Sequence, residues 1–193
     1  MKNFTQLSDQ ELVTAYMNGQ ENSLSVLVER HKNKIFTSIY LLVKDRYLAE
    51  DIFQDVFIRI IDTLRNGRYN EEGKFLPWAQ RIAHNLCVDH FRKVKRSPSI
   101  KTSEDHDIFE VLNFSEAGKD EKIMATETQE KVRMMIDMLP EDQREIIILR
   151  NYADLSFKEI AQLTNSSINT CLGRMRYALI NLRKMMTEKQ IAL

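Results

Sequence analysis

Glycine and proline are scarce in this sequence of 193 residues, with five and three copies respectively. Both residues interrupt regular structure, so their scarcity excludes a chain of many short elements joined by tight turns. Cysteine occurs only at Cys87 and Cys171, which excludes a framework of several disulfides and favours a reducing cytoplasm. Apolar residues make up 43% of the chain, enough for buried cores.

Long hydrophobic runs are also missing. The longest, Ile39–Val43, is far short of the roughly 20 residues that a membrane-spanning helix needs. The first ten residues, MKNFTQLSDQ, lack the apolar core of a secretion signal. We therefore expect a cytoplasmic protein.

The chain has no net charge, because 28 Lys and Arg balance 28 Asp and Glu, but its charges are segregated. Residues 1–100 carry 15 basic and 12 acidic side chains, residues 101–139 carry 5 and 10, and residues 140–193 carry 8 and 6. Two mildly basic blocks thus flank an acidic one. This distribution excludes a uniformly cationic surface and allows local contacts with nucleic acid.

Apolar residues recur at helical spacing over most of the chain. Ser8 and Glu11 have the spacing of a capping box before the first amphipathic stripe, and Gly19 follows its end. The segment 66–75 breaks the pattern, and Pro77 then stands where the first turn of a helix tolerates it. No strand alternation of useful length is present, so the sequence predicts an all-α fold.

The acidic block divides the chain, because helical periodicity is lost from residue 97 to about residue 120. We predict an N-terminal helical domain over 1–97, an acidic linker over 98–123 and a C-terminal helical domain over 124–193. Within the last, Pro140 is expected to open a helix.

Residues 154–186 carry the sharpest local signal: a short helix, a polar break at Thr164–Ser167 and a longer helix. This order predicts a helix-turn-helix, whose second helix enters the major groove of DNA. Its inward face is predicted to carry Ile168, Cys171, Met175, Ala178 and Leu182. Its outward face is predicted to contact bases and phosphates through Asn169, Thr170, Arg174, Arg176 and Tyr177, with Arg183 and Lys184 further along. The alternative is a helical hairpin with a solvated basic face.

A second candidate for nucleic-acid contact is the segment 75–96, FLPWAQRIAHNLCVDHFRKVKR. An aromatic ring beside a basic helix suits single-stranded nucleic acid, in which bases stack on rings and cations follow phosphates. The candidate residues are Trp78, Arg92, Lys93 and Arg96. The alternative is that Trp78 belongs to the core and the basic end is solvated.

An acidic and amide stripe occupies the polar side of the helix expected around residues 48–64, at Asp51, Gln54, Asp55 and Asp62. It would repel DNA, so it faces either solvent or a protein partner.

No pattern in the sequence requires an enzyme, a metal or another cofactor. His84, Cys87 and His90 are spaced three residues apart, and no second cluster completes a four-ligand site. No nucleophile–base arrangement, phosphate-binding glycine loop or carboxylate pair stands out, and no small-molecule substrate is indicated.

Two stretches together resemble a known family. AEDIFQDVFIRI (49–60) with FLPWAQRIAHNLCVDHFRK (75–93), and LPEDQREIIILRNYADLSFKEIAQLTNSSINTCLGRMRYALINLRK (139–184), resemble the extracytoplasmic-function sigma factors, the compact two-domain class of bacterial sigma factors. The resemblance covers about residues 8–96 and 124–186.

The resemblance implies a set of partners and roles. Asp51, Gln54 and Asp55 would bind the β′ clamp helices of core RNA polymerase. The loop 66–76 and the helix after Trp78, including Asn85, would open and read the promoter −10 element. The C-terminal domain would bind the β flap and read the −35 element as duplex DNA. The linker would run toward the RNA exit channel, and an anti-sigma factor is a common partner in the family. No cofactor is implied, because the polymerase performs the chemistry.

One departure from the family lies in the recognition helix, where Leu172 and Gly173 stand at positions that often carry basic and small polar residues. The spacing of Leu172 with Ile168 and Met175 would allow it to pack inward. Which promoter sequence is read therefore stays open, as does the alternative of a stand-alone helix-turn-helix regulator.

Overall fold

The computed structural model describes residues 4–70, 73–96 and 130–188. No strand occurs in these ranges, so the all-α prediction is confirmed for them. The described helices fall into two compact units, with α1 to α4 in the first and α6 to α8 in the second. None of them is long and apolar enough to cross a membrane. The predicted linker, 98–123, lies outside the described residues, and the predicted domain boundaries stay predictions.

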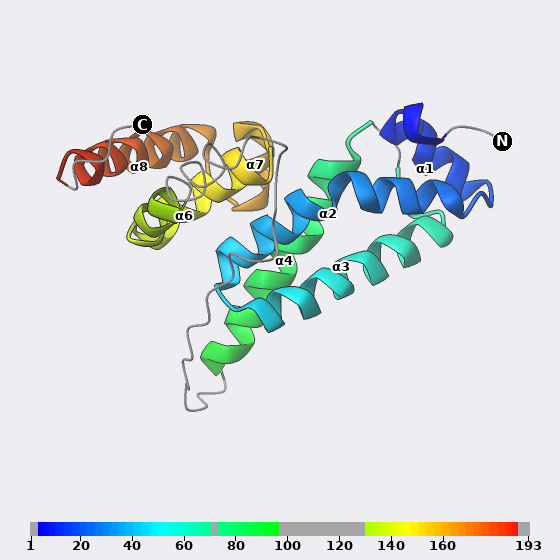
Figure 1. Cartoon of the computed structure of the whole chain (residues 1–193), viewed down its shortest axis with the longest axis horizontal. Helices are drawn as coiled ribbons and strands as arrows, with labels where there is room; N and C mark the ends of the chain where they lie inside the picture. The colour runs from blue at the N-terminus through cyan, green and yellow to red at the C-terminus, as the bar shows by residue number, and fades with distance from the viewer. Residues whose placement is uncertain (1–3, 71–72, 97–129, 189–193) are drawn as a thin grey trace, which may run out of the picture. The chain divides into compact units, whose positions relative to one another are not determined.

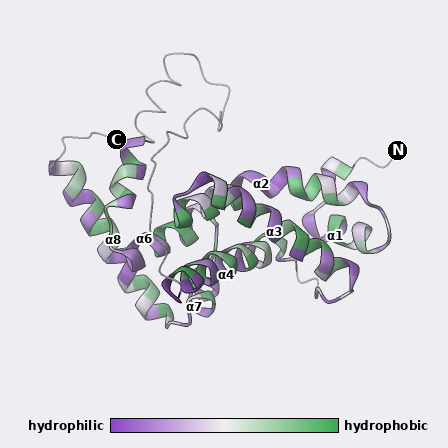
Figure 2. Cartoon of the chain, turned by 90° about the horizontal axis from the view of Figure 1, so that it is seen from below, coloured by the Kyte–Doolittle hydropathy of each residue, from purple (hydrophilic) through white to green (hydrophobic). Residues whose placement is uncertain are grey.

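The first unit contains the 3-10 turn η1 (Phe4–Gln6), α1 (Asp9–Met17), α2 (Asn22–Val43), α3 (Arg46–Arg65) and α4 (Phe75–Arg96) (Figure 1). Helix α2 packs against α1, α3 and α4, and α3 also packs against α4. Each helix carries hydrophobic residues on one side and hydrophilic residues on the other (Figure 2). The hydrophobic sides meet in a core that includes Leu12, Leu27, Ile35, Ile39, Val56, Ile60 and Leu64.

Local signals set the ends of α1 as the sequence predicts. The Ser8 hydroxyl accepts a hydrogen bond from the Glu11 backbone N–H at 3.3 Å, and the Glu11 carboxylate accepts one from the Ser8 N–H at 2.8 Å. At the other end Gly19 has a φ of +87°, and the Gln20 N–H donates to the Ala15 carbonyl at 3.0 Å. Glycine suits this left-handed position because it has no Cβ.

A buried polar pair fixes α4 on α2. The Ser38 hydroxyl donates to Gln80 Oε1 at 2.6 Å, and Gln80 Nε2 donates to the Lys34 carbonyl at 3.3 Å. Both side chains are almost fully buried. Since an unsatisfied buried amide is costly, these bonds favour one register between the two helices.

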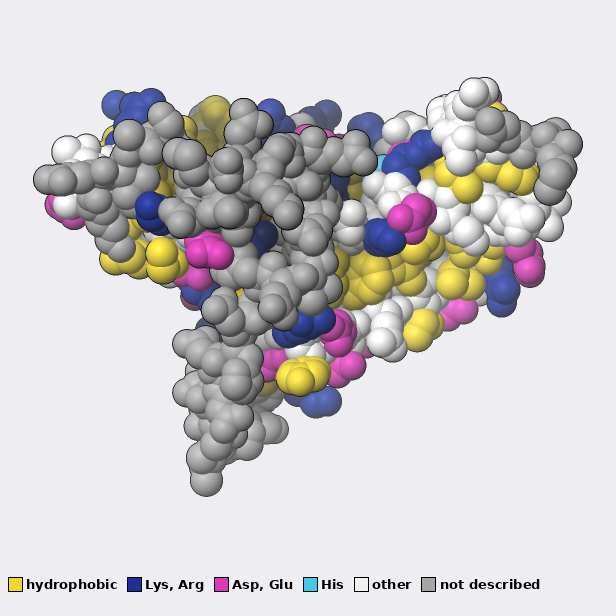
Figure 3. Space-filling view, in the orientation of Figure 1, with side chains coloured by type: hydrophobic (Ala, Val, Ile, Leu, Met, Phe, Trp, Pro, Cys, Tyr) yellow, Lys and Arg dark blue, Asp and Glu magenta, His cyan; other side chains and the backbone are white. Residues whose placement is uncertain are grey.

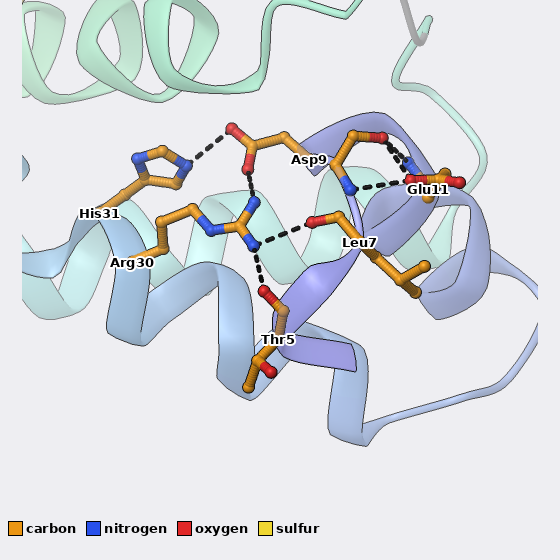
Figure 4. Close-up of polar contacts among 7 residues, drawn as sticks. Thr5, Leu7, Asp9, Glu11, Arg30 and His31 are labelled. Carbon is orange, nitrogen blue, oxygen red and sulfur yellow. Dashed lines mark hydrogen bonds and ion pairs between the residues drawn. The ribbon is translucent and has the colours of Figure 1, made fainter. Parts of the chain in front are cut away.

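A polar cluster attaches the N-terminal segment to α2 (Figure 4). Asp9 Oδ1 lies 2.6 Å from Arg30 Nη1, and Asp9 Oδ2 lies 2.7 Å from His31 Nε2. Arg30 Nη2 also donates to the carbonyls of Leu7 at 2.9 Å and Thr5 at 3.3 Å. A single carboxylate thus orients two neighbouring side chains of α2, and the guanidinium holds the chain that precedes α1.

The second unit contains a helix over 130–137, α6 (Glu141–Ile147), most of the π-helical turn η2 (Ile148–Tyr152), α7 (Phe157–Leu163) and α8 (Ile168–Glu188). Pro140 is the N-cap of α6, as predicted. Helix α8 packs against α6 and α7. The buried apolar residues of this unit include Met135, Ile136, Ile148, Leu149, Ile160, Cys171 and Ala178.

Candidate functional site

Hydrogen bonds fix the start of α7 and the turn between α7 and α8. Ser156 begins α7 as a capping box with Glu159. At the end of α7, Asn165 adopts a left-handed φ of +50°, and the Ser166 N–H donates to the Ala161 carbonyl at 2.9 Å. Asn is among the few residues that tolerate this conformation, which redirects the chain directly after the helix.

The start of α8 is held by the residue before it. The Thr170 N–H donates to Ser167 Oγ at 3.0 Å, and the two hydroxyl oxygens lie 2.9 Å apart. Cys171 is fully buried, with its Sγ 3.3 Å from Ser166 Oγ. Helix α8 therefore starts in a fixed direction, and the predicted helix-turn-helix geometry is present in the structure.

The predicted outward residues of α8 separate into two groups. Asn169, Thr170, Arg176 and Tyr177 are exposed. Arg174 instead is half-buried, with its Nε 3.3 Å from Asp142 Oδ2 of α6. Arg174 is thus less exposed than the other four, because α6 supplies a carboxylate that holds its guanidinium against the unit, and its contact with DNA stays a prediction.

Fewer residues of α8 are buried than the apolar spacing of the helix predicts. Cys171 and Ala178 are buried, and Met175 and Leu182 are half-buried. Ile168 and Leu172 are each 45% exposed, so the inward placement predicted for Ile168 is wrong, and Leu172 does not take the inward position that its spacing allows. Successive residues lie about 100° apart around a helix. Leu172 is therefore turned well away from Cys171, which lies on the covered side.

The polar side of α3 presents the predicted acidic and amide stripe, since Asp51, Gln54, Asp55 and Asp62 are all exposed. The opposite side is buried through Ile52, Val56 and Ile60. In Figure 3, acidic and hydrophobic side chains lie together along the edge formed by α3.

Two exposed apolar residues on this stripe were missed by the sequence reasoning. Tyr47 is 80% exposed and Ile58 is 55% exposed. Tyr47 lies four residues before Asp51, and Ile58 lies three residues after Asp55, so both share the stripe's face. Helical spacing counted from the acidic residues could have identified them.

The predicted −10 residues are mostly exposed. Asn85, Arg92, Lys93 and Arg96 lie on the surface of α4, while Trp78 is half-buried. The Trp78 ring packs against the Tyr69 ring in a tilted arrangement, with 4.3 Å between ring centroids. Trp78 therefore contributes to packing, as the alternative reading proposed, and keeps part of its ring accessible.

The loop between α3 and α4 is part of the core. Tyr69 is only 8% exposed and Phe75, the first residue of α4, is fully buried. Two residues of the segment 66–76, which is expected to read the −10 element, therefore belong to the core of the first unit. Residues 71–72 lie outside the described part of the loop.

His84, Cys87 and His90 lie on α4, where His84 and Cys87 are buried and His90 is half-buried. Burial raises the pKa of the Cys87 thiol to about 12, which opposes the thiolate form that binds metals. Within the described ranges, no three His, Cys, Asp or Glu side chains are grouped so that they could hold a metal ion.

The comparisons with known proteins agree with this geometry. The family model of Sigma-70 region 2 matches residues 27–97, and that of Sigma-70, region 4 matches residues 129–179. The RNA polymerase sigma-H factor of Pseudomonas aeruginosa is 31% identical over 175 residues, covering 88% of this chain and 89% of the relative. The ECF RNA polymerase sigma-E factor of Escherichia coli (strain K12) is 30% identical over 176 residues, covering 88% and 89%.

Solved structures show the same fold. CnrH in complex with the cytosolic domain of CnrY matches with a TM-score of 0.61 at 20% identity, covering 93% of this chain and 97% of that one. The sigma factor RpoE of Bartonella quintana, in complex with the anti-sigma factor NepR, matches with a TM-score of 0.62 at 19% identity, covering 85% and 96%.

Proposed function

This chain belongs to the extracytoplasmic-function (ECF) RNA polymerase sigma factors. We propose which of its surfaces bind core RNA polymerase and which bind the promoter. As an alternative sigma factor it binds core RNA polymerase and directs promoter-specific initiation of transcription. One observation carries the assignment of surfaces: the acidic stripe of α3 and the basic outer face of α8 belong to different compact units.

The second unit reads the −35 element in this proposal. Asn169, Thr170, Arg176 and Tyr177 stand exposed on the first half of α8, and Arg183 and Lys184 follow on its second half. Amide, hydroxyl and guanidinium groups at the start of a recognition helix are suited to base edges and phosphates. Arg174 contributes beside Asp142, where its terminal nitrogens can still face a phosphate.

The first unit binds the β′ clamp helices through Asp51, Gln54 and Asp55, with Tyr47 and Ile58 as apolar contacts on the same face. This face supports the role because its carboxylates attract a basic partner surface, while exposed apolar residues supply contact area. Contact of the second unit with the β flap rests on the family alone.

The −10 element is read in this proposal by α4 and the preceding loop. The half-buried Trp78 ring offers a stacking surface, and Asn85, two turns along α4, offers a donor and an acceptor to one base edge. Arg92, Lys93 and Arg96 at the exposed end of α4 follow the phosphates of the opened strand.

We propose that the protein acts in the cytoplasm, where its polymerase partner is, and that an anti-sigma factor controls it. Support for this partner comes from the similar structure of RpoE, which is described in complex with the anti-sigma factor NepR.

Size-exclusion chromatography with core RNA polymerase, followed by run-off transcription, tests the assignment. A sigma factor co-elutes with the core enzyme and confers initiation at a −35/−10 promoter. A stand-alone regulator would bind duplex DNA without co-eluting, and that result would contradict the proposal.

A further inference from the structure

Leu172 is an exposed leucine at the start of the helix that faces DNA. It lies in the first two turns of α8 and is 45% exposed. Asn169, three residues before it, and Arg176, four residues after it, are also exposed. Residues at these spacings are neighbours on a helix surface. Leu172 therefore stands between two polar side chains that the proposed function assigns to the −35 element.

The structure also places Leu172 and Arg176 along one shallow groove of α8, together with Met175, Leu179, Ile180 and Arg183. The adjacent Gly173 has no Cβ, and open space surrounds the position that a Cβ would take. A DNA backbone or base edge can therefore approach Leu172 closely beside Gly173.

The chemistry of leucine restricts what it can recognise in the major groove. Its side chain neither donates nor accepts hydrogen bonds, so contact with a polar base edge leaves that edge without water or a partner. The 5-methyl group of thymine is the apolar feature that base pairs present in the major groove. A leucine at this place is thus complementary to thymine and unfavourable to the other bases.

We propose that Leu172 packs against the 5-methyl group of one thymine in the −35 element and thereby selects thymine at that position. This inference rests on the proposed function, because it requires α8 to enter the major groove. It adds a specificity-determining residue that lacks any hydrogen-bonding group, beside Arg176, whose guanidinium suits guanine or phosphate.

The rest of the groove provides a matched control. Leu179 carries the same side chain at 43% exposure, but it lies seven residues further along α8. At 1.5 Å per residue that is about 10 Å along the helix axis, beyond the first turns that meet the bases. Leu172→Ala and Leu179→Ala remove the same atoms at different distances from the base edges.

Removal of single methyl groups from DNA tests the proposal on the holoenzyme. A promoter library randomised at −35 first supplies a preferred sequence. Each thymine of that element is then replaced in turn by deoxyuridine, which pairs like thymine but lacks the 5-methyl group. We expect one replacement to weaken binding of the wild-type holoenzyme about fourfold, the effect of losing one buried methyl-sized group.

The two variants then decide the role of Leu172. The Leu172→Ala holoenzyme should bind the preferred promoter more weakly and lose its sensitivity to that replacement, whereas Leu179→Ala should keep it. Core binding, measured in parallel, should be unchanged for both variants. The inference is overturned if no replacement matters or if Leu172→Ala keeps the wild-type sensitivity. Failure of the wild type to bind core polymerase or a −35 promoter would overturn the proposed function itself.

Discussion

At the scale of single residues, Arg174 connects DNA recognition with packing inside the second unit. Its Nε is paired with Asp142 of α6, and a half-exposed pair of this kind adds at most about 1 kcal/mol to stability. We expect Arg174→Ala to weaken binding to a −35 promoter by about 1–3 kcal/mol if the guanidinium also contacts DNA. Run-off transcription and promoter binding by the reconstituted holoenzyme measure the loss.

Asp142→Asn is the control for this prediction, because it removes the carboxylate charge while keeping the guanidinium. It should leave promoter binding within about twofold of the wild type. Equal losses for Arg174→Ala and Asp142→Asn would mean that Arg174 acts only through the packing of α6 on α8.

Cys87 gives the first unit a predictable response to alkaline pH. Burial raises the pKa of its thiol from 9.0 to about 12, while an exposed thiol in the unfolded chain ionises near the lower value. As the pH rises through this window, the unfolded state loses a proton that the folded state keeps. The stability linked to Cys87 is therefore complete below the unfolded pKa and declines above it.

We expect the free energy of unfolding of the wild type to fall more steeply from pH 9 to pH 12 than that of Cys87→Ala. The variant also loses packing at every pH, so the slope, and not the absolute value, is the informative quantity. Urea unfolding at a series of pH values measures it. Parallel pH dependences for the two proteins would show that Cys87 ionises without affecting the fold.

At the scale of elements, the loop between α3 and α4 combines an exposed part with a buried anchor. Tyr69 packs against Trp78 and is nearly buried, whereas Asn66, Gly67, Arg68 and Asn70 are exposed. We expect exchange of the exposed loop residues for those of another family member, with Tyr69 retained, to change the preferred −10 base. The −35 preference should stay the same. Libraries randomised at each element measure both.

Tyr69→Ala is the contrasting variant. It should destabilise the first unit by about 3 kcal/mol, the usual cost of removing a large buried aromatic ring, which thermal unfolding can detect. If the loop exchange leaves the −10 preference unchanged, the loop only connects α3 to α4 and does not select the −10 base.

Asn85 tests the role of α4 in the same element. Its side chain is exposed, so Asn85→Ala should fold normally. We expect weaker discrimination at one non-template position of the −10 element, because an amide can pair with one base edge only after that base has left the duplex. Binding to promoters that carry each base at that position gives the measurement. Unchanged discrimination at every position would make Asn85 an ordinary surface residue.

At the scale of the whole molecule, binding to the polymerase clamp and binding to the −35 element should be separable by mutation, because they are assigned to different units. Asp51→Lys with Asp55→Lys reverses the charge of the α3 stripe without touching the core beneath it. We expect core affinity to fall roughly tenfold or more, since a basic partner surface would then meet a basic face. Circular dichroism should match the wild type.

Glu21→Lys with Glu29→Lys is the matched control, because it reverses two exposed acidic residues of the same unit outside the stripe. Its core affinity should stay near that of the wild type. If both double variants lose affinity equally, net charge and not the α3 stripe governs binding. If neither loses affinity, the stripe is solvated.

The sequence alone determined helices and several helix ends, because apolar spacing and capping residues act over a few neighbouring residues. Apolar residues at helical spacing predicted an all-α fold, and Ser8, Gly19 and Pro140 marked helix ends that the structure confirms. The acidic face of α3 followed in the same way, since the residues opposite a buried stripe of a helix must lie on its surface.

Only the tertiary structure decided which neighbours cover each face. Periodicity gives a direction around a helix axis, but whether another element lies in that direction depends on packing between segments distant in sequence. Asp9 meets His31, and Asp142 meets Arg174, by contacts of that kind. No local signal marked Tyr69 as buried. For Leu172 the spacing allowed an inward position, but no helix within the described ranges covers that side of α8, and Leu172 is exposed instead.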